Sequence, residues 1–412
     1  MATLLAVAAA VLAAWLTVSA VLLLAYRREL SRLWREPVFR VPVLIIESDD
    51  WGAGPLVQAD ALQRISEVLK RHRDATGRPP VMCLALVLAV PDGPAIERDG
   101  VYQRVELDDP RFAAVLAALK AGVDDGVFAL QLHGHEHYWP PALMASGDPA
   151  VQAWLRGAVP ATTEQLPSHL QSRWVDALGL PSKPLSAAEI REAVEAEIKA
   201  YARIVGEPPG IVVPPTFVWT KAVEAAWDAA GLKGVVTPGW RYPLRNAQGL
   251  PDGDEGPITS GDRVEGLCYL VRSDYFEPAR GRDARYALAA FERAVMQGRP
   301  CILENHRDNF IQGPVACENS LRQLDALVAG ALARESALRV LSTCEFERIL
   351  READPAWICA ALKDRIPFLW ARLRHSGRPW KLMRWCGLVA VGAVLVRAVS
   401  RIAASGRRVT AS

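Results

Sequence analysis

The amino-acid sequence predicts an α/β barrel that follows a single N-terminal membrane helix. Three observations lead to this fold class. The chain begins with a long uncharged apolar stretch, short β-branched runs then alternate with alanine-rich stretches from about residue 42 to residue 350, and polar residues follow the apolar runs. At 412 residues the chain is long enough to contain one barrel of about 250 residues or more.

Residues 2–26 form the predicted membrane helix. They carry no charged side chain, and at ~1.5 Å rise per residue they reach roughly 37 Å, which exceeds the ~30 Å thickness of a bilayer core. A cleaved signal peptide is the alternative, but it would have basic residues before the apolar run and a small-residue cleavage site after it. Neither feature is present, so we expect an uncleaved, single-pass anchor in the cell membrane.

Charge is distributed unevenly around this segment. Residues 27–40, the expected juxtamembrane linker, carry five Arg against two Glu. By the positive-inside rule this flank faces the cytoplasm, so we expect a cytoplasmic rather than an extracytoplasmic folded domain.

The C-terminal segment, residues 353–412, is also basic. From residue 365 onward it contains ten Lys or Arg residues and no acidic residue, around an apolar run at 386–396 that is too short to span a bilayer. We expect this segment to bind membrane lipid at the interface, and a solvated tail is the alternative.

Residues 41–352 are expected to form the barrel. The expected strands are 41–48, 80–89, 127–132, 210–214, 234–237, 267–272, 300–304 and 338–341. The expected helices are 59–72, 112–121, 186–205, 220–230, 285–297 and 319–334. Such alternation gives right-handed βαβ units and a parallel sheet, and seven or eight units indicate a closed or nearly closed barrel.

Two segments interrupt the alternation. Residues 138–185 form a long insertion with three Trp residues, which is typical of a lid or binding loop, and residues 243–264 are expected to form a second surface loop.

Composition excludes some classes of protein. The formal net charge of +2 does not indicate a nucleic-acid-binding protein, and no feature implies a protein partner. The seven cysteines are scattered without a C-x-x-C motif, which fits reduced thiols better than a secreted disulfide framework.

Two short polar clusters carry most of the functional information. Asp49 and Asp50 follow the first apolar run, and His133 and His137 follow the third, in an H-x-x-x-H pattern. Two imidazoles and one carboxylate hold zinc and leave a position open for water. A second carboxylate beside the metal can take the proton from that water. The sequence therefore predicts a site for one divalent metal, with zinc as the expected ion.

Further polar residues follow the other predicted strands. Residues 214–217 follow the fourth, residues 240–242 follow the fifth, and residues 305–308 follow the seventh. The carboxyl ends of parallel barrel strands meet at one rim, so we expect these residues to converge with the two clusters.

These motifs resemble the polysaccharide deacetylase superfamily, of the NodB-homology or carbohydrate esterase 4 type, over about residues 41–350. The resemblance implies a distorted (β/α)7 barrel of the glycoside hydrolase/deacetylase type. It also implies that Asp49 is the catalytic base, that Asp50, His133 and His137 bind the metal, and that His306 is the general acid. Supporting roles are expected for Glu47, His135, Glu136, Arg241, Glu304 and Arg307. Substrate contacts are expected from Trp51, Pro215, Phe217 and Trp240.

The sequence departs from the family pattern at two positions. The family usually has an Arg before its prolines that orients the base, whereas Val213 stands there. Arg241 or Arg307 is expected to take over that role. The family also has Ser or Thr after the first His of the second motif, and this chain has Gly134. Between the two histidines, His135 and Glu136 are expected to point away from the metal.

The sequence thus predicts a membrane-anchored hydrolase that removes an N- or O-acyl group from a carbohydrate, with a lipid-linked glycan as the favoured substrate and a free polysaccharide as the second. Three alternatives remain. They are a glycosidase on the same fold, which would need paired carboxylates about 5 to 10 Å apart, a catalytically inactive glycan-binding barrel, and a membrane scaffold.

Overall fold

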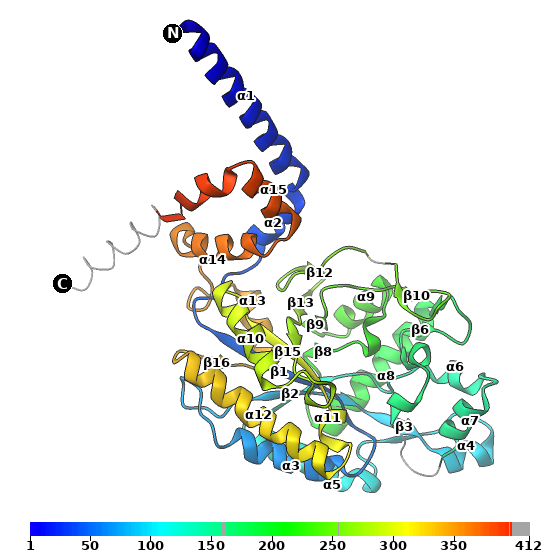
Figure 1. The fold of residues 1–412 in the computed structure, drawn as a ribbon. Coiled ribbons are helices and arrows are strands. Elements are labelled where there is room, and N and C mark those ends of the chain that lie inside the picture. Colours follow the sequence, from blue (N-terminus) through cyan, green and yellow to red (C-terminus); the bar gives the residue numbers. More distant parts are fainter. Residues whose placement is uncertain (158–161, 254, 395, 398–412) are drawn as a thin grey trace. The chain divides into compact units, whose positions relative to one another are not determined.

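The computed structural model describes residues 1–412 except 158–161, 254, 395 and 398–412 (Figure 1). Its contacts divide the chain into two units. The anchor unit comprises residues 1–40, 293–299 and 353–412, and the sheet unit comprises residues 41–292 and 300–352. Arg401, Arg407 and Arg408 of the basic tail lie outside the described residues.

The sheet unit is built on one curled, mostly parallel sheet. Along the sheet its main strands are β13 (Leu267–Val271), β9 (Gly234–Thr237), β8 (Ile211–Val212), β5 (Phe128–Leu132), β2 (Met82–Val87), β1 (Val43–Gly52) and β15 (Cys301–His306). The shorter strands are β12 (Arg263–Val264), antiparallel to β13, β14 (Asp274–Tyr275), parallel to β15, and β16 (Arg339–Val340), parallel to β1. Every residue of β1 and β2 is buried, as the apolar runs predict for a sheet covered on both faces.

The segment that contains β13 and β14 is bonded to both ends of this sheet. The Arg272 N–H donates to the Thr237 carbonyl of β9 at 2.9 Å, and the next N–H, of Ser273, donates to the Ile302 carbonyl of β15 at 2.8 Å. The sheet therefore curls round until one stretch of chain joins its two sides, and Arg272 lies at that seam.

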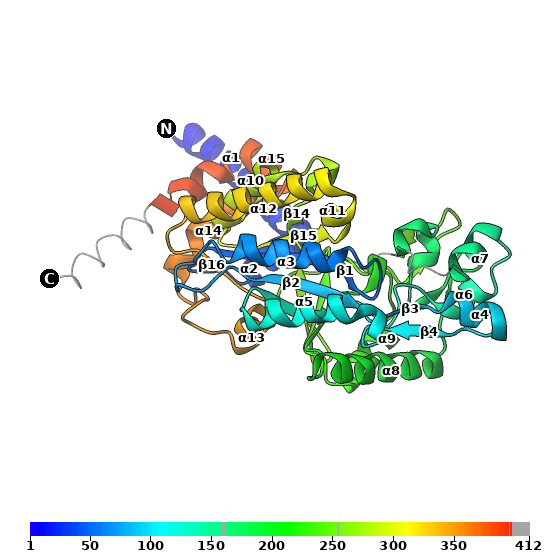
Figure 2. The ribbon, with the colours of Figure 1, turned by 90° about the horizontal axis from the view of Figure 1, so that it is seen from below.

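Helices connect the parallel strands, as the alternation predicts. They are α3 (Gln58–Leu69), α5 (Ala113–Asp124), α8 (Ala187–Val205), α9 (Lys221–Ala229), α10 (Ala284–Met296) and α12 (Pro314–Arg334), and α13 (Thr343–Glu352) follows the last strand, β16. Helices α5, α3 and α12 pack side by side along the sheet (Figure 2). Local sequence fixes the ends of α8, where Ser186 and Glu189 form a capping box and Gly206 adopts a left-handed conformation after the last turn.

Strand β1 contains a bulge of one extra residue where it pairs with β2. Ser48 pairs with Leu84 and Trp51 pairs with Leu86, so three steps along β1 match two steps along β2. Within this bulge Asp50 has a φ of 71°. Consecutive residues of a regular strand point to opposite faces, whereas a bulge re-aims them. The extra residue is what allows neighbouring aspartates to serve one site.

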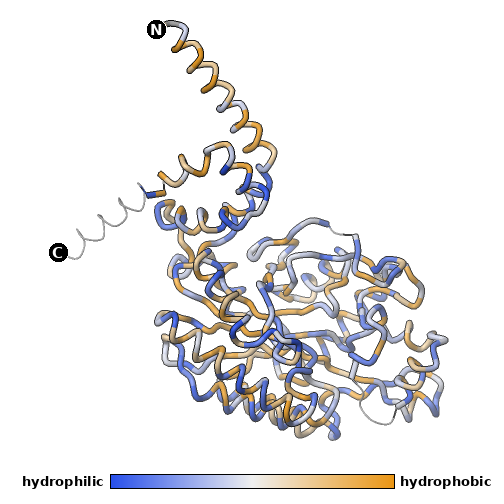
Figure 3. The backbone as a smooth tube through the Cα atoms, in the orientation of Figure 1, coloured by the Kyte–Doolittle hydropathy of each residue, from blue (hydrophilic) through white to orange (hydrophobic). Residues whose placement is uncertain are grey.

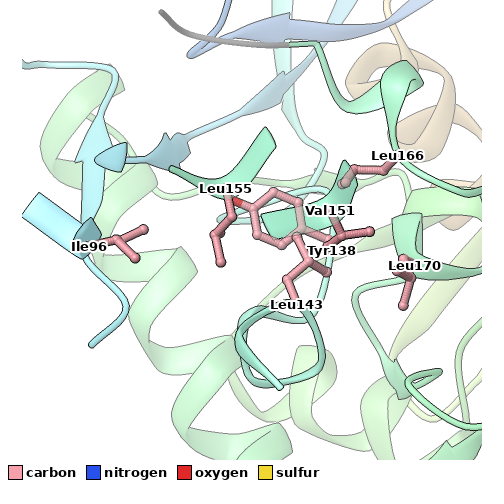
Figure 4. Packing of buried hydrophobic residues seen from close by; sticks show 7 residues of the cluster. All are labelled: Ile96, Tyr138, Leu143, Val151, Leu155, Leu166 and Leu170. Atoms are coloured by element: carbon pink, nitrogen blue, oxygen red, sulfur yellow. The ribbon is translucent and has the colours of Figure 1, made fainter. Parts of the chain in front are cut away.

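The insertion at 138–185 is a small folded module with its own apolar core. It contains α6 (Pro140–Met144), α7 (Pro149–Leu155), η2 (Thr163–Gln165) and η3 (Ser168–Gln171). Its buried cluster consists of Tyr138, Leu143, Val151, Leu155, Leu166 and Leu170 together with Ile96 from α4 (Gly93–Asp99) (Figure 4). The sequence did not predict α4 or the adjoining hairpin of β3 (Ala89–Pro91) and β4 (Arg104–Glu106). The expected loop at 243–264 also holds a short hairpin, β10 (Leu244–Arg245) and β11 (Pro251–Asp252).

The anchor unit contains α1 (Ala2–Ala25), α2 (Arg27–Arg35), α14 (Leu362–Arg374) and α15 (Arg378–Trp385). Residues Thr3–Ala25 of α1 have a mean hydropathy of 2.5 and are long and apolar enough to cross a membrane; a signal sequence would meet the same criterion (Figure 3). In the C-terminal segment, α14 and α15 are helical, and α14 contains Pro367. Arg372 is buried and donates to the carbonyls of Gln297, Gly298, Glu36 and Pro37, which ties α14 to the chain that follows α2.

The bulge in β1 requires glycine at position 52. This residue has a φ of 108°, and an added Cβ would lie 2.4 Å from the Val87 carbonyl oxygen. We expect Gly52→Ala to lower the free energy of unfolding by about 1–3 kcal/mol or more, because it combines left-handed strain with a backbone clash. Thermal unfolding with Gly77→Ala as the control separates the two effects, since Gly77 also has positive φ but has nothing within 4 Å of the added Cβ. Equal losses in both variants would contradict the clash.

Candidate metal centre

Asp50, His133 and His137 lie together at the carboxyl ends of β1 and β5. Asp50 Oδ1 is 3.4 Å from Nε2 of His133 and 3.4 Å from Nε2 of His137, and the three side chains are buried. Their ligand atoms all lie within 4.8 Å of one another. The structure therefore brings together the three residues that the sequence predicts as metal ligands.

The spacing suits a bound cation better than hydrogen bonds. Ligands at about 2.0–2.2 Å from a tetrahedral zinc are separated by about 3.3–3.6 Å. Among the described residues, Asp50 Oδ1 has no hydrogen-bond partner although it is buried, and such an unpaired acceptor is costly. Burial lowers the pKa of His137 to about 4, which keeps its ring neutral and able to bind a metal. The donor set thus fits a divalent ion of the zinc type.

The backbone orients His133. Its Nδ1 donates to the Val213 carbonyl at 2.7 Å, which leaves Nε2 directed toward Asp50. Val213 follows β8, at the position where the family pattern has an arginine. The same turn explains Gly134, because this residue has a φ of 105° and an added Cβ would lie 2.8 Å from the Glu136 carbonyl oxygen. A Ser or Thr would be strained there.

The predicted base, Asp49, is held by an arginine that the sequence analysis did not single out. Arg272 Nη1 and Nη2 donate to the two carboxylate oxygens of Asp49 at 2.8 and 2.7 Å, and its Nε donates to Glu47 at 2.8 Å. Arg272 also lies 3.3 Å from Glu304 and over the ring of Phe217. Burial would raise the pKa of Asp49, but the charge of Arg272 outweighs it, so this pKa lies below its usual value.

The prediction that Arg241 or Arg307 orients the base is therefore wrong. Arg241 is paired with Glu224 and Glu255 away from Asp49. The side chain of Arg307 lies 3.5 Å from Glu164, and only its backbone N–H contacts Asp49, at the carbonyl. The signal for Arg272 was present in the sequence, since it is the polar residue that ends the sixth predicted strand.

His306 lies beside Asp49, because the two residues are partners in the β1–β15 register. Its Nδ1 contacts Glu277 at 2.5 Å, and Asn309 donates to the other oxygen of Glu277 at 2.5 Å. Although burial opposes it, the bond to Glu277 and the nearby aspartates raise the pKa of His306 to about 10. Nε2 of a protonated His306 is then available as a proton donor. Glu277, which follows β14, was not predicted from the sequence.

His135 and Glu136 point away from the metal ligands, as expected. His135 contacts Glu106 at 2.7 Å, and Glu136 pairs with Arg104 and Arg173. They line a separate cavity of about 340 Å³. These contacts tie the turn between His133 and His137 to the insertion, which contributes Arg173.

Two of the predicted substrate contacts are enclosed by protein. Trp51 is fully buried and donates to the Ser48 hydroxyl at 2.8 Å, so it supports the bulge and is not accessible to a substrate. Pro215 is buried beneath the turn at Gly134. Phe217 and Trp240 are partly exposed, and their contact with substrate stays a prediction.

Among the described residues of the insertion, Glu164 lies near this centre. Glu164 of η2 lies 3.5 Å from Arg307, and burial together with the charge of Asp50 raises its pKa. This places η2 of the insertion beside Arg307 and near Asp50. The Trp residues at 154 and 174 pack within the protein, against Tyr138 and Trp227 respectively.

No protein-family model matches this sequence, and no curated protein matches it. Solved structures that match this chain include a presumed polysaccharide deacetylase from Mycobacterium smegmatis, at 11% identity and a TM-score of 0.41 over 77% of this chain and 96% of that chain. Another is a family 4 acetyl xylan esterase from Clostridium thermocellum in complex with cobalt, at 10% identity and a TM-score of 0.38 over 76% of this chain and 94% of that chain. A third is a family 4 carbohydrate esterase from Streptomyces lividans in complex with acetate, at 12% identity and a TM-score of 0.32 over 72% of this chain and 90% of that chain. Each TM-score is below 0.5, so the residues of the site carry the functional assignment.

The arginine at the seam has a testable effect on pH dependence. Arg272→Gln should raise the pKa of Asp49, because it removes the charge that keeps this carboxylate ionised. A base is active above its pKa, so the acidic limb of the activity profile should move to higher pH by about 1–3 units. Arg241→Gln, which removes an arginine that is also buried but outside the site, should leave that limb in place. An unmoved limb in Arg272→Gln would contradict the assigned pairing.

The contact between His306 and Glu277 should determine the alkaline limb of the pH–activity profile. Glu277→Gln should lower the pKa of His306 from about 10 toward its usual value near 6.5, and the alkaline limb should move to lower pH. The stabilisation from this pair is present below the unfolded pKa and is lost as pH rises through about 10. Activity and unfolding measured across the same pH series test both statements, with the exposed Glu195→Gln as control.

Proposed function

We propose that this protein is a membrane-anchored, divalent-metal-dependent hydrolase that removes an N- or O-acyl group from a carbohydrate. One observation carries the proposal: a buried cluster of one carboxylate and two imidazoles lies beside an arginine-held carboxylate and a glutamate-held histidine. The cluster can hold a metal, and the two flanking groups can move protons on either side of a scissile bond.

A metal bound by Asp50, His133 and His137 would supply Lewis acidity and lower the pKa of a water toward about 7. Asp49, kept ionised by Arg272, accepts the proton of the attacking water. His306, kept protonated by Glu277, donates a proton from Nε2 to the leaving nitrogen or oxygen. Removal of an acyl group from an amide or ester needs these two transfers.

The carboxylates of the site argue against a glycosidase. Such enzymes need a protonated carboxylic acid that reaches the leaving oxygen. Here Glu47, Asp49 and Glu304 all pair with Arg272, and Asp50 belongs to the metal cluster. The carboxyl group with a raised pKa, Glu164, lies 3.5 Å from the cationic Arg307. The complete set of ligand, base and acid side chains likewise argues against an inactive glycan-binding barrel.

A lipid-linked acyl sugar is the substrate that best fits an anchored enzyme. Helix α1 is long and apolar enough to hold the chain in a bilayer, and the adjoining helices are rich in arginine. A catalytic domain kept at a membrane meets lipid-carried glycans more often than free polysaccharide.

Substitutions of a predicted metal ligand and of the predicted base should have different effects on metal content and turnover. His133→Ala should lose the metal, whereas Asp49→Asn should keep it and lose about 10²- to 10⁴-fold in turnover, the amount attributed to a general base. Metal analysis of each purified protein, with acetate or formate release from lipid extracts and from a soluble acyl sugar, tests both. Full metal occupancy in His133→Ala would contradict the ligand assignment.

Sidedness is a separate prediction. By the positive-inside rule, we expect the arginines that follow α1 to lie on the cytoplasmic side, and the C-terminus with them. A green fluorescent protein fused after Ser412 should fluoresce, and alkaline phosphatase at the same place should be inactive. The reverse pattern would overturn the orientation and leave the catalytic assignment intact.

A further inference from the structure

Within the anchor unit, two amphipathic helices meet around an open apolar cavity. Helix α2 presents Leu30, Leu33 and Trp34 at positions i, i+3 and i+4, and α14 presents its apolar residues with the same spacing. The cavity has a volume of about 280 Å³. The α14 side chains that line it are Ile366, Leu369, Trp370 and Leu373.

These apolar faces do not form a closed core. None of the seven side chains that α2 and α14 contribute to the cavity is buried, and Trp34 is 48% exposed. The two helices are nevertheless held together, because Arg372 donates to carbonyls at the end of α2 and beyond it, and Arg365 lies over the Trp34 ring. The two helices are therefore held in place around the cavity, and no apolar side chain of the described residues fills it.

The position of the cavity in the sequence, close to the end of α1, indicates that it lies at the membrane interface. Only Tyr26 separates α1 from α2, so Leu30 comes five residues after the end of the candidate span. That is about 7.5 Å of helix, within the depth of about 5–10 Å at which interfacial helices bury their apolar faces. Trp15 of α1 also donates to the Cys386 carbonyl at 2.6 Å, so the chain after α15 lies against the apolar helix itself.

The positive charge of the helices around the cavity indicates a lipid with an anionic headgroup. Helices α2, α14 and α15 together carry eleven Lys or Arg residues and two acidic residues. Apart from the buried Arg372, these cations lie at or near the surface of the unit. A basic surface beside the acyl region attracts anionic lipid.

We propose that the cavity between α2 and α14 binds one acyl chain of an anionic phospholipid, whose headgroup is held by the surrounding arginines. The inference rests on one part of the proposed function, the anchorage by α1, and is independent of the chemistry at the metal centre. The bound lipid completes the apolar packing of the anchor unit.

Lipid retention by the full-length protein tests this site. The protein is purified in dodecyl maltoside, mixed with phosphatidylglycerol or phosphatidylcholine, freed of excess lipid, and weighed intact by native mass spectrometry. Wild type should retain about one phosphatidylglycerol per chain and at least tenfold less phosphatidylcholine.

Variants of the cavity wall should lose this lipid at least tenfold. Leu33→Glu introduces a charge, and Leu369→Trp fills the cavity without one. Ser31→Glu is the matched control, because it places the same charge on an exposed position of α2. Circular dichroism checks that the helices remain formed in each variant.

Three results would overturn the site: equal retention by the two cavity variants and the control, equal retention of the two lipids by wild type, or a dimer that dissociates on Leu33→Glu, which would make a second copy the occupant. The proposed function is tested separately. Asp50→Ala should abolish hydrolysis and keep the lipid, while Leu33→Glu should keep hydrolysis of a soluble acyl sugar. A wild-type chain that is not recovered with membranes would contradict the anchorage itself.

Discussion

The bulge in β1 is the constraint on which the site depends. In a regular strand Asp49 and Asp50 would face opposite sides of the sheet, and only one of them could reach the histidines. The extra residue, with Asp50 at positive φ, brings one carboxylate to Arg272 and the next to His133 and His137. Strained backbone of this kind persists only where the surrounding structure determines it. Here the buried Trp51 and the close approach of Gly52 to β2 fix it.

Charge balance explains the rest of the arrangement. Arg272 is the cation shared by Glu47, Asp49 and Glu304, and removing one partner of such a buried network is strongly destabilising. Asp50 stands outside this network beside two imidazoles, one of which burial keeps neutral. A divalent cation at this position would balance Asp50 and leave Arg272 free to pair with Asp49. The protonated His306 is balanced in turn by Glu277.

The sequence predicted the elements well, because buried parallel strands read as continuous apolar runs and the helices between them are alanine-rich. All eight expected strands are present in the described part of the chain, and the expected metal ligands lie together. Arg272 and Glu277 were missed because Asp49 lies 223 residues from Arg272 and His306 lies 29 residues from Glu277, so that only the folded sheet brings each pair together. Trp51 was misjudged because its position beside two site residues does not reveal that the bulge turns its ring inward. Short hairpins such as β3–β4 carry too few residues to give a periodic signal.

The claim that Asp50, His133 and His137 hold a metal has one direct measurement. Anomalous diffraction at the zinc absorption edge, from crystals of the zinc-loaded protein, should show a single strong peak. The account predicts that this peak lies about 2.0–2.2 Å from Asp50 Oδ1 and from Nε2 of both histidines. A peak bound elsewhere, or none at this cluster under full zinc loading, would contradict it.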